Sequence, residues 1–236
     1  MELVISEFEA KVQEISEYFS FIEKTTHLRL HDNRGMVQVS KTVHNVLKAN
    51  LFLLLYNLVE SSFKNTLEKI CINITNDTLK YKDVIPEIKK MWIEKEYKNF
   101  GNLTIPKNTK KSEFIMNKIE NIANDIVKIE FYRNDKKTKN DDISGNLDVR
   151  EMKRINEKYG AKLDTVPNMD ANSLLTVKTK RNNLAHGNET FSECGENYTM
   201  NELREIEKES IKYMRFILNH IKSFIINKQY KLQEEN

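Results

Sequence analysis

The sequence predicts an all-α protein, an antiparallel helical bundle with long helices and with helical or loop insertions. Only 6 Gly and 3 Pro occur in 236 residues, too few for the many turns of a β-sandwich. Apolar residues also recur at steps of three and four over long segments, which is the helical period. The length is sufficient for one large core, so we expect a single all-helical domain over residues 1–236.

The first two helices are the longest regular segments in the N-terminal part. Residues 3–24 form an amphipathic helix, and residues 26–36, which contain Gly35, form a loop, so that 1–36 is an N-terminal helix and loop. A second helix covers residues 39–74. The apolar stripes consist of Val4, Phe8, Val12, Ile15, Phe19 and Ile22 in the first, and Val43, Leu47, Leu51, Leu54, Leu58 and Phe63 in the second.

The middle of the chain contains two shorter helices and a polar segment. Pro86 suits the first turn of a third helix that ends near Gly101, and Ser112 can cap a fourth over 113–130. Residues 132–146 are almost wholly polar and are expected to form a flexible connection.

Two further helices follow, and the second ends in the segment 181–187, which carries the candidate catalytic residues. A fifth, over 148–159, ends at Gly160. Asp170 can cap a sixth, over 171–186, and Gly187 follows as a left-handed terminating residue.

A loop of about a dozen residues is expected before the last helix. Thr199-Met-Asn-Glu202 then matches a capping box and opens a helix that continues to about Tyr230. No segment shows a strand pattern.

Composition restricts the function without identifying it. A net charge of +3 permits a nucleic-acid partner but does not demand one. No signal peptide is apparent, and the most apolar run, 51–59, is far shorter than the ~20 residues of a membrane span, so we expect a cytoplasmic protein without membrane contact. Cys71 and Cys194 lie outside any CxxC and are expected to be free thiols, with no metal and no cofactor bound.

The sixth predicted helix carries an unusual charge. At 100° per residue, Arg181 falls in the middle of the apolar stripe formed by Leu174, Val177, Leu184 and Ala185. An unpaired buried Arg costs several kcal/mol, so this guanidinium must meet a partner, a solvated cleft or a subunit interface. Glu60, which interrupts the apolar part of the second helix, either pairs with Arg181 or is simply exposed.

Asn182 and His186 lie four residues apart and are neighbours on the adjoining face. Asn182 can orient the His186 ring, although a local cap or surface role fits equally well. Lys178 and Lys180 add positive charge and are candidate RNA-binding residues. For Arg181 and His186 themselves, the alternative to a functional site is a structural polar pair at a helix end.

An Arg and a His suit cleavage of a phosphodiester by an internal nucleophile. In RNA this nucleophile is the ribose 2′-OH; His would move its proton, and Arg would stabilise the charge on the phosphorane oxygens. One His cannot easily serve on both sides of the phosphorus, but a two-fold homodimer would bring a second Arg181–His186 pair to a composite site. The same spacing recurs at Arg215 and His220, mid-helix, and we interpret that pair as incidental.

The segment Arg181-Asn-Asn-Leu-Ala-His186-Gly resembles the R-x4–6-H signature of the HEPN superfamily (higher eukaryotes and prokaryotes nucleotide-binding), in particular its stand-alone bacterial ribonuclease-like members. Three other segments also resemble that family, and the likeness covers most of residues 40–225. They are Leu55-Tyr-Asn-Leu-Val-Glu60, Ser144-Gly-Asn-Leu-Asp148 through Tyr159-Gly160, and Phe191-Ser-Glu-Cys-Gly195.

The resemblance implies a helical bundle, a homodimer and metal-independent cleavage of RNA with Arg181 and His186 as the catalytic pair. It also implies a bacterial defence or toxin–antitoxin context, with an antitoxin or defence protein as partner. Some toxins of the family have a modifiable Tyr two residues after the His; Asn188 stands there in this chain, so that regulation is not carried over. A catalytically inactive HEPN-like module for RNA binding or dimerisation is the alternative function.

Overall fold

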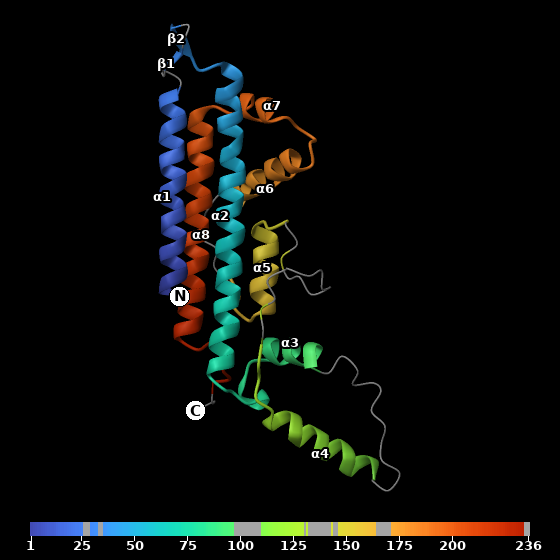
Figure 1. The fold of residues 1–236 in the computed structure, drawn as a ribbon. Coiled ribbons are helices and arrows are strands. Elements are labelled where there is room, and N and C mark those ends of the chain that lie inside the picture. The colour runs from blue at the N-terminus through green and yellow to red at the C-terminus, as the bar shows by residue number, and fades with distance from the viewer. Residues whose placement is uncertain are drawn as a thin grey trace. The chain divides into compact units, whose positions relative to one another are not determined.

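The computed structural model describes residues 1–25, 29–32, 35–96, 110–129, 131, 143, 146–163 and 171–233. Residue contacts divide the chain into two compact units, which are described separately. The first unit comprises 1–66, 143–152 and 165–219; the second comprises 67–142, 153–164 and 220–236. The all-helical fold class is confirmed (Figure 1), whereas a single domain over 1–236 stays a prediction.

Three long helices form the body of the first unit: α1 (Glu2–Thr25), α2 (Lys41–Asn76, as far as residue 66) and α8 (Met200–Ile226, as far as residue 219). Side-chain contacts show that α1 runs antiparallel to both others. On α8, Arg215 binds Glu9 through two hydrogen bonds of 2.8 and 2.7 Å, and Arg204 pairs with Glu23. On α2, the partners are Ser61 with Lys11 and Asn65 with Glu7.

Most of the apolar stripe predicted for α1 faces this core, as the helical spacing requires. The stripe predicted for α2 was partly wrong: Leu51, Leu58 and Phe63 are buried, whereas Val43 is 50% and Leu54 36% exposed. The core residues are almost completely buried. They include Phe8, Phe19, Ile22, Leu51, Phe52, Leu55, Leu58, Met214, Ile217 and Leu218.

The first unit also holds α6 (Ala171–Ala185), α7 (Phe191–Glu196) and the first residues of α5 (Val149–Lys158). The capping box at Thr199 and Glu202 is confirmed: the Thr199 N–H and hydroxyl both donate to the Glu202 carboxylate, and the Glu202 N–H donates back at 3.2 Å.

The second unit contains the rest of α2 and α5, the 3-10 turn η1 (Tyr81–Asp83), α3 (Pro86–Glu96), α4 (Lys111–Asn124) and the C-terminal segment. Asp77 fixes that segment, because it accepts hydrogen bonds from Lys228 at 2.8 Å and from the Tyr230 hydroxyl at 2.9 Å. Gly160 follows α5 with φ +76°, as its position after the fifth predicted helix implies.

Several predicted elements were wrong in detail. Part of the loop predicted over 26–36 is a short antiparallel hairpin of β1 (Arg29–Asp32) and β2 (Gly35–Gln38), in which Arg29 pairs with Gln38 and Asp32 with Gly35. Strands of four residues are too short for an alternating pattern to identify them.

Two helix boundaries also differ from the prediction. Ser112 does not cap the fourth helix: its N-cap is Lys110, which makes no capping hydrogen bond, and the helix ends at Asn124. The loop expected after Gly187 contains α7, opened by a capping box of Thr190 and Glu193. Gly101, Asp170 and most of the polar connection 132–146 lie outside the described residues.

Candidate active site at the end of helix α6

Helix α6 ends in a tight reversal that puts His186 at its C-terminal boundary. The Asn188 N–H donates to the Asn183 carbonyl at 2.9 Å and the Gly187 N–H to the Leu184 carbonyl at 3.4 Å. These two bonds satisfy carbonyls that a helix end leaves open, and they require the left-handed Gly187, whose φ is +69°. His186 is exposed, and a Cβ on Gly187 would meet no atom within 4 Å. The imidazole therefore stands beside open space.

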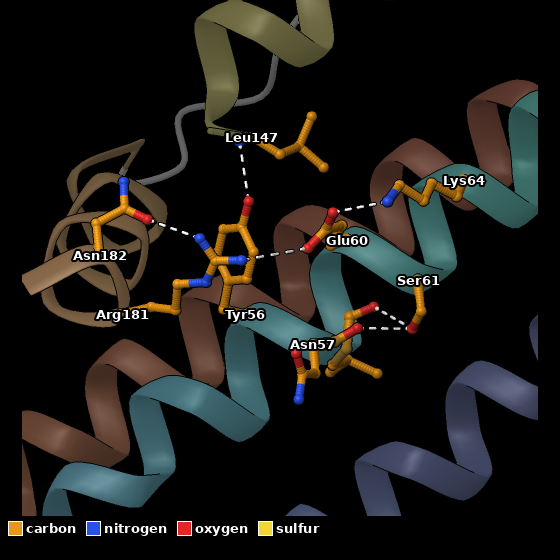
Figure 2. A network of polar contacts seen from close by, with 9 residues as sticks. Tyr56, Asn57, Glu60, Ser61, Lys64, Leu147, Arg181 and Asn182 are labelled. Atoms are coloured by element: carbon orange, nitrogen blue, oxygen red, sulfur yellow. Dashed lines mark hydrogen bonds and ion pairs between the residues drawn. The ribbon is translucent and has the colours of Figure 1, made fainter. Parts of the chain in front are cut away.

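Arg181, five residues earlier, has a tightly defined environment (Figure 2). Its guanidinium carbon lies 4.2 Å from the centroid of the Tyr56 ring on α2, a cation–π stack. Nη1 donates to the Asn182 side-chain oxygen at 2.8 Å, and Nη2 lies 3.9 Å from Glu60 Oε2. The side chain keeps 27% of its exposure, so the guanidinium is held in place but still accessible.

The Tyr56 ring forms a fixed aromatic surface under this guanidinium. The residue is 1% exposed, and its hydroxyl accepts a hydrogen bond from the Leu147 N–H at 3.2 Å. Burial raises the pKa of Tyr56, so the hydroxyl stays neutral and uncharged beneath the cation. The ring plane is thus fixed from both the α2 core and the chain segment before α5.

Glu60 lies one helical turn after Tyr56 and faces two cations. Its Oε1 accepts a hydrogen bond from Lys64 at 2.7 Å, while Oε2 faces Arg181. Of the two alternatives that the sequence left open for Glu60, the structure has the pairing with Arg181. The distance of 3.9 Å is at the outer limit of an ion pair, so Glu60 restrains Arg181 without holding it by a direct hydrogen bond.

Asn182 contacts different groups from those that the sequence suggested. Its oxygen accepts from Arg181, and its nitrogen donates to the Asn146 side-chain oxygen at 2.8 Å. Both ends of the amide are therefore engaged away from His186, and Asn182 orients the guanidinium instead. The helical spacing placed Asn182 near His186, but the direction of its amide depends on Asn146, which is 36 residues distant in sequence.

Lys178 and Lys180, predicted to bind RNA, each pair with a carboxylate within the protein. Lys178 binds Asp148 at 2.6 Å, and Lys180 binds Glu189 at 2.8 Å; all four side chains are at most 21% exposed. The first pair joins α6 to the start of α5, and the second spans the reversal that carries His186. This geometry favours a structural role for both lysines, and RNA binding by them stays a prediction.

Sequence reasoning missed Tyr56, Asp148 and Glu189 as parts of this site. A signal existed for Tyr56, because it lies four residues before Glu60 and so shares its face of α2. The second Arg–His spacing has a different environment: Arg215 is half exposed and bound to Glu9.

Two features are absent from the described residues. They contain no group of three or more His, Cys, Asp or Glu side chains arranged to hold a metal ion. None of the helices described is both long and apolar enough to cross a membrane.

Comparison with known protein families gives a match over nearly the whole chain. A family model described as HEPN_MAE_28990-like HEPN matches residues 2–230. No curated protein and no solved structure matches the chain. The match supports a function related to RNA or to nuclease activity.

Proposed function

The chain belongs to the HEPN_MAE_28990-like HEPN family, and from this premise we propose that it is a metal-independent endoribonuclease with Arg181 and His186 as its catalytic pair. One observation carries the proposal: a guanidinium held by Tyr56 and Asn182, and restrained by Glu60, lies five residues before an exposed imidazole at an open helix end. Phosphodiester cleavage requires both a preorganised cation and a group that can transfer protons, and the end of α6 carries both.

In the proposed reaction, His186 accepts the proton of the ribose 2′-OH as its oxygen attacks the adjacent phosphorus. Arg181 stabilises the negative charge that develops on the non-bridging oxygens. The bond from phosphorus to the 5′-oxygen breaks, and that oxygen takes up a proton. The products are a 2′,3′-cyclic phosphate and a 5′-hydroxyl. DNA lacks the 2′-OH and would not be cleaved in this way.

The proton for the leaving oxygen must come from the opposite side of the phosphorus. We assign it to His186 of a second copy of the chain in a homodimer, which would bring two Arg181–His186 pairs to one cleft. The 27% exposure of the Arg181 side chain leaves it accessible to a second copy of the chain.

Cleavage of single-stranded RNA in EDTA tests the activity. We expect the wild type to cleave and to leave cyclic phosphate ends detectable by mass spectrometry, and we expect R181A and H186A each to lose nearly all activity. R215A is the matched control, since it removes an Arg with the same spacing to a His from an exposed ion pair; it should cleave normally. Activity that survives both substitutions at the site, or that needs a metal, would refute the proposal. An inactive wild type that still binds RNA or dimerises would establish the binding module instead.

The dimer is tested separately by light scattering during size-exclusion chromatography. We expect a mass of twice 27.9 kDa. A monodisperse monomer that cleaves RNA would contradict the composite site.

We place the enzyme in a cytoplasmic bacterial defence or toxin–antitoxin system, in which a partner protein holds its activity. Induced expression in a bacterium should then arrest growth, and R181A should relieve the arrest. Normal growth with active wild-type enzyme would contradict this setting.

A further inference from the structure

A groove of about 650 Å³ lies between α1 and α2 in the first unit. This volume falls within the usual range of ligand sites. The lining of the groove combines three apolar side chains, which we call the floor, with three neutral hydrogen-bonding side chains and four charged ones. They are Ile15, Leu54 and Leu58; Tyr18, Asn57 and Ser61; and Lys11, Glu14, Glu60 and Lys64.

Glu60 is common to the groove and the candidate active site. This residue lines the groove, and its Oε2 lies 3.9 Å from Arg181 Nη2. Figure 2 shows Asn57 and Ser61 projecting from a different face of α2 than Tyr56 and Glu60. One face of α2 therefore serves Arg181, while the neighbouring face forms a wall of the groove.

The charges of the lining do not suit a phosphate. Two lysines and two glutamates give no net charge, Lys64 is bound to Glu60 at 2.7 Å, and Lys11 donates to Ser61 at 2.8 Å. A phosphate would have to break these contacts and would meet two carboxylates. A neutral group with a flat apolar face and a polar edge fits better.

One aromatic side chain of the lining indicates what that group is. Tyr18 on α1 lines the groove, and its hydroxyl donates to the Leu47 carbonyl at 3.0 Å. Unpaired RNA bases stack on such rings, and amide and carboxylate groups such as Asn57 and Glu14 bind their edges.

We propose that this groove holds an unpaired base of single-stranded RNA, close to the phosphate that Arg181 contacts; the inference rests on the proposed function. Glu14 forms no ion pair among the described residues, and its carboxylate can accept from an exocyclic amino group. The groove therefore favours adenine, cytosine or guanine over uracil.

The test uses the full chain and two kinds of RNA. A cleavable single-stranded RNA gives kcat and KM in EDTA, and a fully 2′-O-methylated RNA of the same sequence, which has no free 2′-OH, gives Kd. L54E places a charge in the floor, and Leu54 is exposed enough for the change to be compatible with folding. Y18L removes the stacking ring, whereas Y18F keeps it. I72E on α2 is the matched control, because Ile72 is similarly exposed and lies outside the groove.

We expect L54E and Y18L to raise KM and Kd about ten-fold with little change in kcat, which corresponds to about 1.4 kcal/mol. Y18F and I72E should bind as the wild type does. E14Q should weaken the preference for amino-bearing bases next to the cut, as read by sequencing the fragment ends. Circular dichroism verifies folding, and L54Q provides a milder change in the floor.

Failure of the groove proposal and failure of the proposed function give different results. If the wild type cleaves RNA but L54E, L54Q and Y18L keep wild-type KM and Kd, the groove does not bind RNA and the inference is wrong. If the wild type fails to cleave in EDTA, the proposed function is wrong, and Kd for the methylated RNA still decides the groove.

Discussion

The guanidinium carbon of Arg181 lies 4.2 Å from the centre of the Tyr56 ring, and this contact connects the candidate site to the core of the first unit. Tyr56 is almost fully buried, and its hydroxyl accepts from the Leu147 N–H, so its ring cannot tilt without disturbing the packing of the core. The position of the guanidinium is therefore set by α2, which is also the helix that carries Glu60. We therefore expect loss of this contact to lower kcat, although Arg181 lies at the partly exposed surface of α6.

Substitutions of Tyr56 separate the ring from its hydroxyl. Y56F keeps the aromatic ring but leaves the Leu147 N–H without its acceptor, which should lower the free energy of unfolding by about 1–3 kcal/mol. Because the ring remains, most of the cleavage activity should be preserved. Y56L removes the aromatic ring and should lower kcat about ten- to a hundred-fold, because a small displacement of the Arg181 guanidinium would weaken its contact with the reacting phosphate. Urea unfolding and kcat in EDTA measure the two effects. A Y56L enzyme with wild-type kcat would show that the stack does not position Arg181.

The ion pair of Lys180 and Glu189 spans the reversal that carries His186, and both side chains are less than 20% exposed. Burial alone would lower the pKa of Lys180, but the hydrogen bond and charge of Glu189 outweigh it, so the pKa lies above its usual value. We expect K180Q to lower the free energy of unfolding by about 1–3 kcal/mol, between the effects of exposed and buried pairs. The double variant K180Q/E189Q should lose less than the sum of the single changes.

The same variant distinguishes the structural role of Lys180 from RNA binding. A lysine that contacts a phosphate contributes about one to the slope of log Kd against log salt concentration. We expect K180Q to leave that slope unchanged. A slope that falls by about one would show that Lys180 binds RNA as the sequence suggested.

Sequence periodicity predicted the long helices because each buries one continuous stripe, and the capping box at Thr199 marked the start of α8. Helix α7 has the same Thr-x-x-Glu signature at Thr190, but its six residues are too few to show a helical period. The location of Arg181 on an apolar stripe was also predictable. Its environment was not, because Tyr56 stacks on it and Asn146 fixes its partner Asn182, both from segments distant in sequence.

Asp148 makes the start of α5 sensitive to acid. Its Oδ1 accepts from the Glu151 N–H at 3.0 Å, and its Oδ2 binds Lys178 at 2.6 Å. Burial would raise the pKa of Asp148, but these contacts outweigh it and hold the pKa below the usual 3.8. A depressed pKa stabilises the fold above the unfolded-state pKa, and this contribution is lost as the pH falls through the folded-state pKa.

We therefore expect the free energy of unfolding to fall below about pH 4, with Asp148 as one contributor. D148N keeps the helix cap but not the charge, so it should be less stable than the wild type at pH 7 and less sensitive to acid. Urea unfolding at both pH values measures the difference. Equal acid sensitivity in the two proteins would assign the effect to other carboxylates.

Three glycines should respond differently to alanine, and the order tests the packing that surrounds each of them. At Gly195 a Cβ would lie 1.9 Å from the backbone oxygen of Asn45 on α2, so G195A must separate α7 from α2 and should cost about 3 kcal/mol or more. At Gly160 the left-handed backbone and the Ile85 side chain give a smaller cost, since that side chain can move.

Gly187 has the same left-handed backbone but open space around it, so G187A should cost only the backbone strain of about 1 kcal/mol. Thermal unfolding ranks the three variants. Because G187A stays folded yet strains the residue directly after His186, any large loss of cleavage in it reports on the placement of the imidazole. A G187A enzyme with full activity would show that the reversal only ends the helix and does not orient His186.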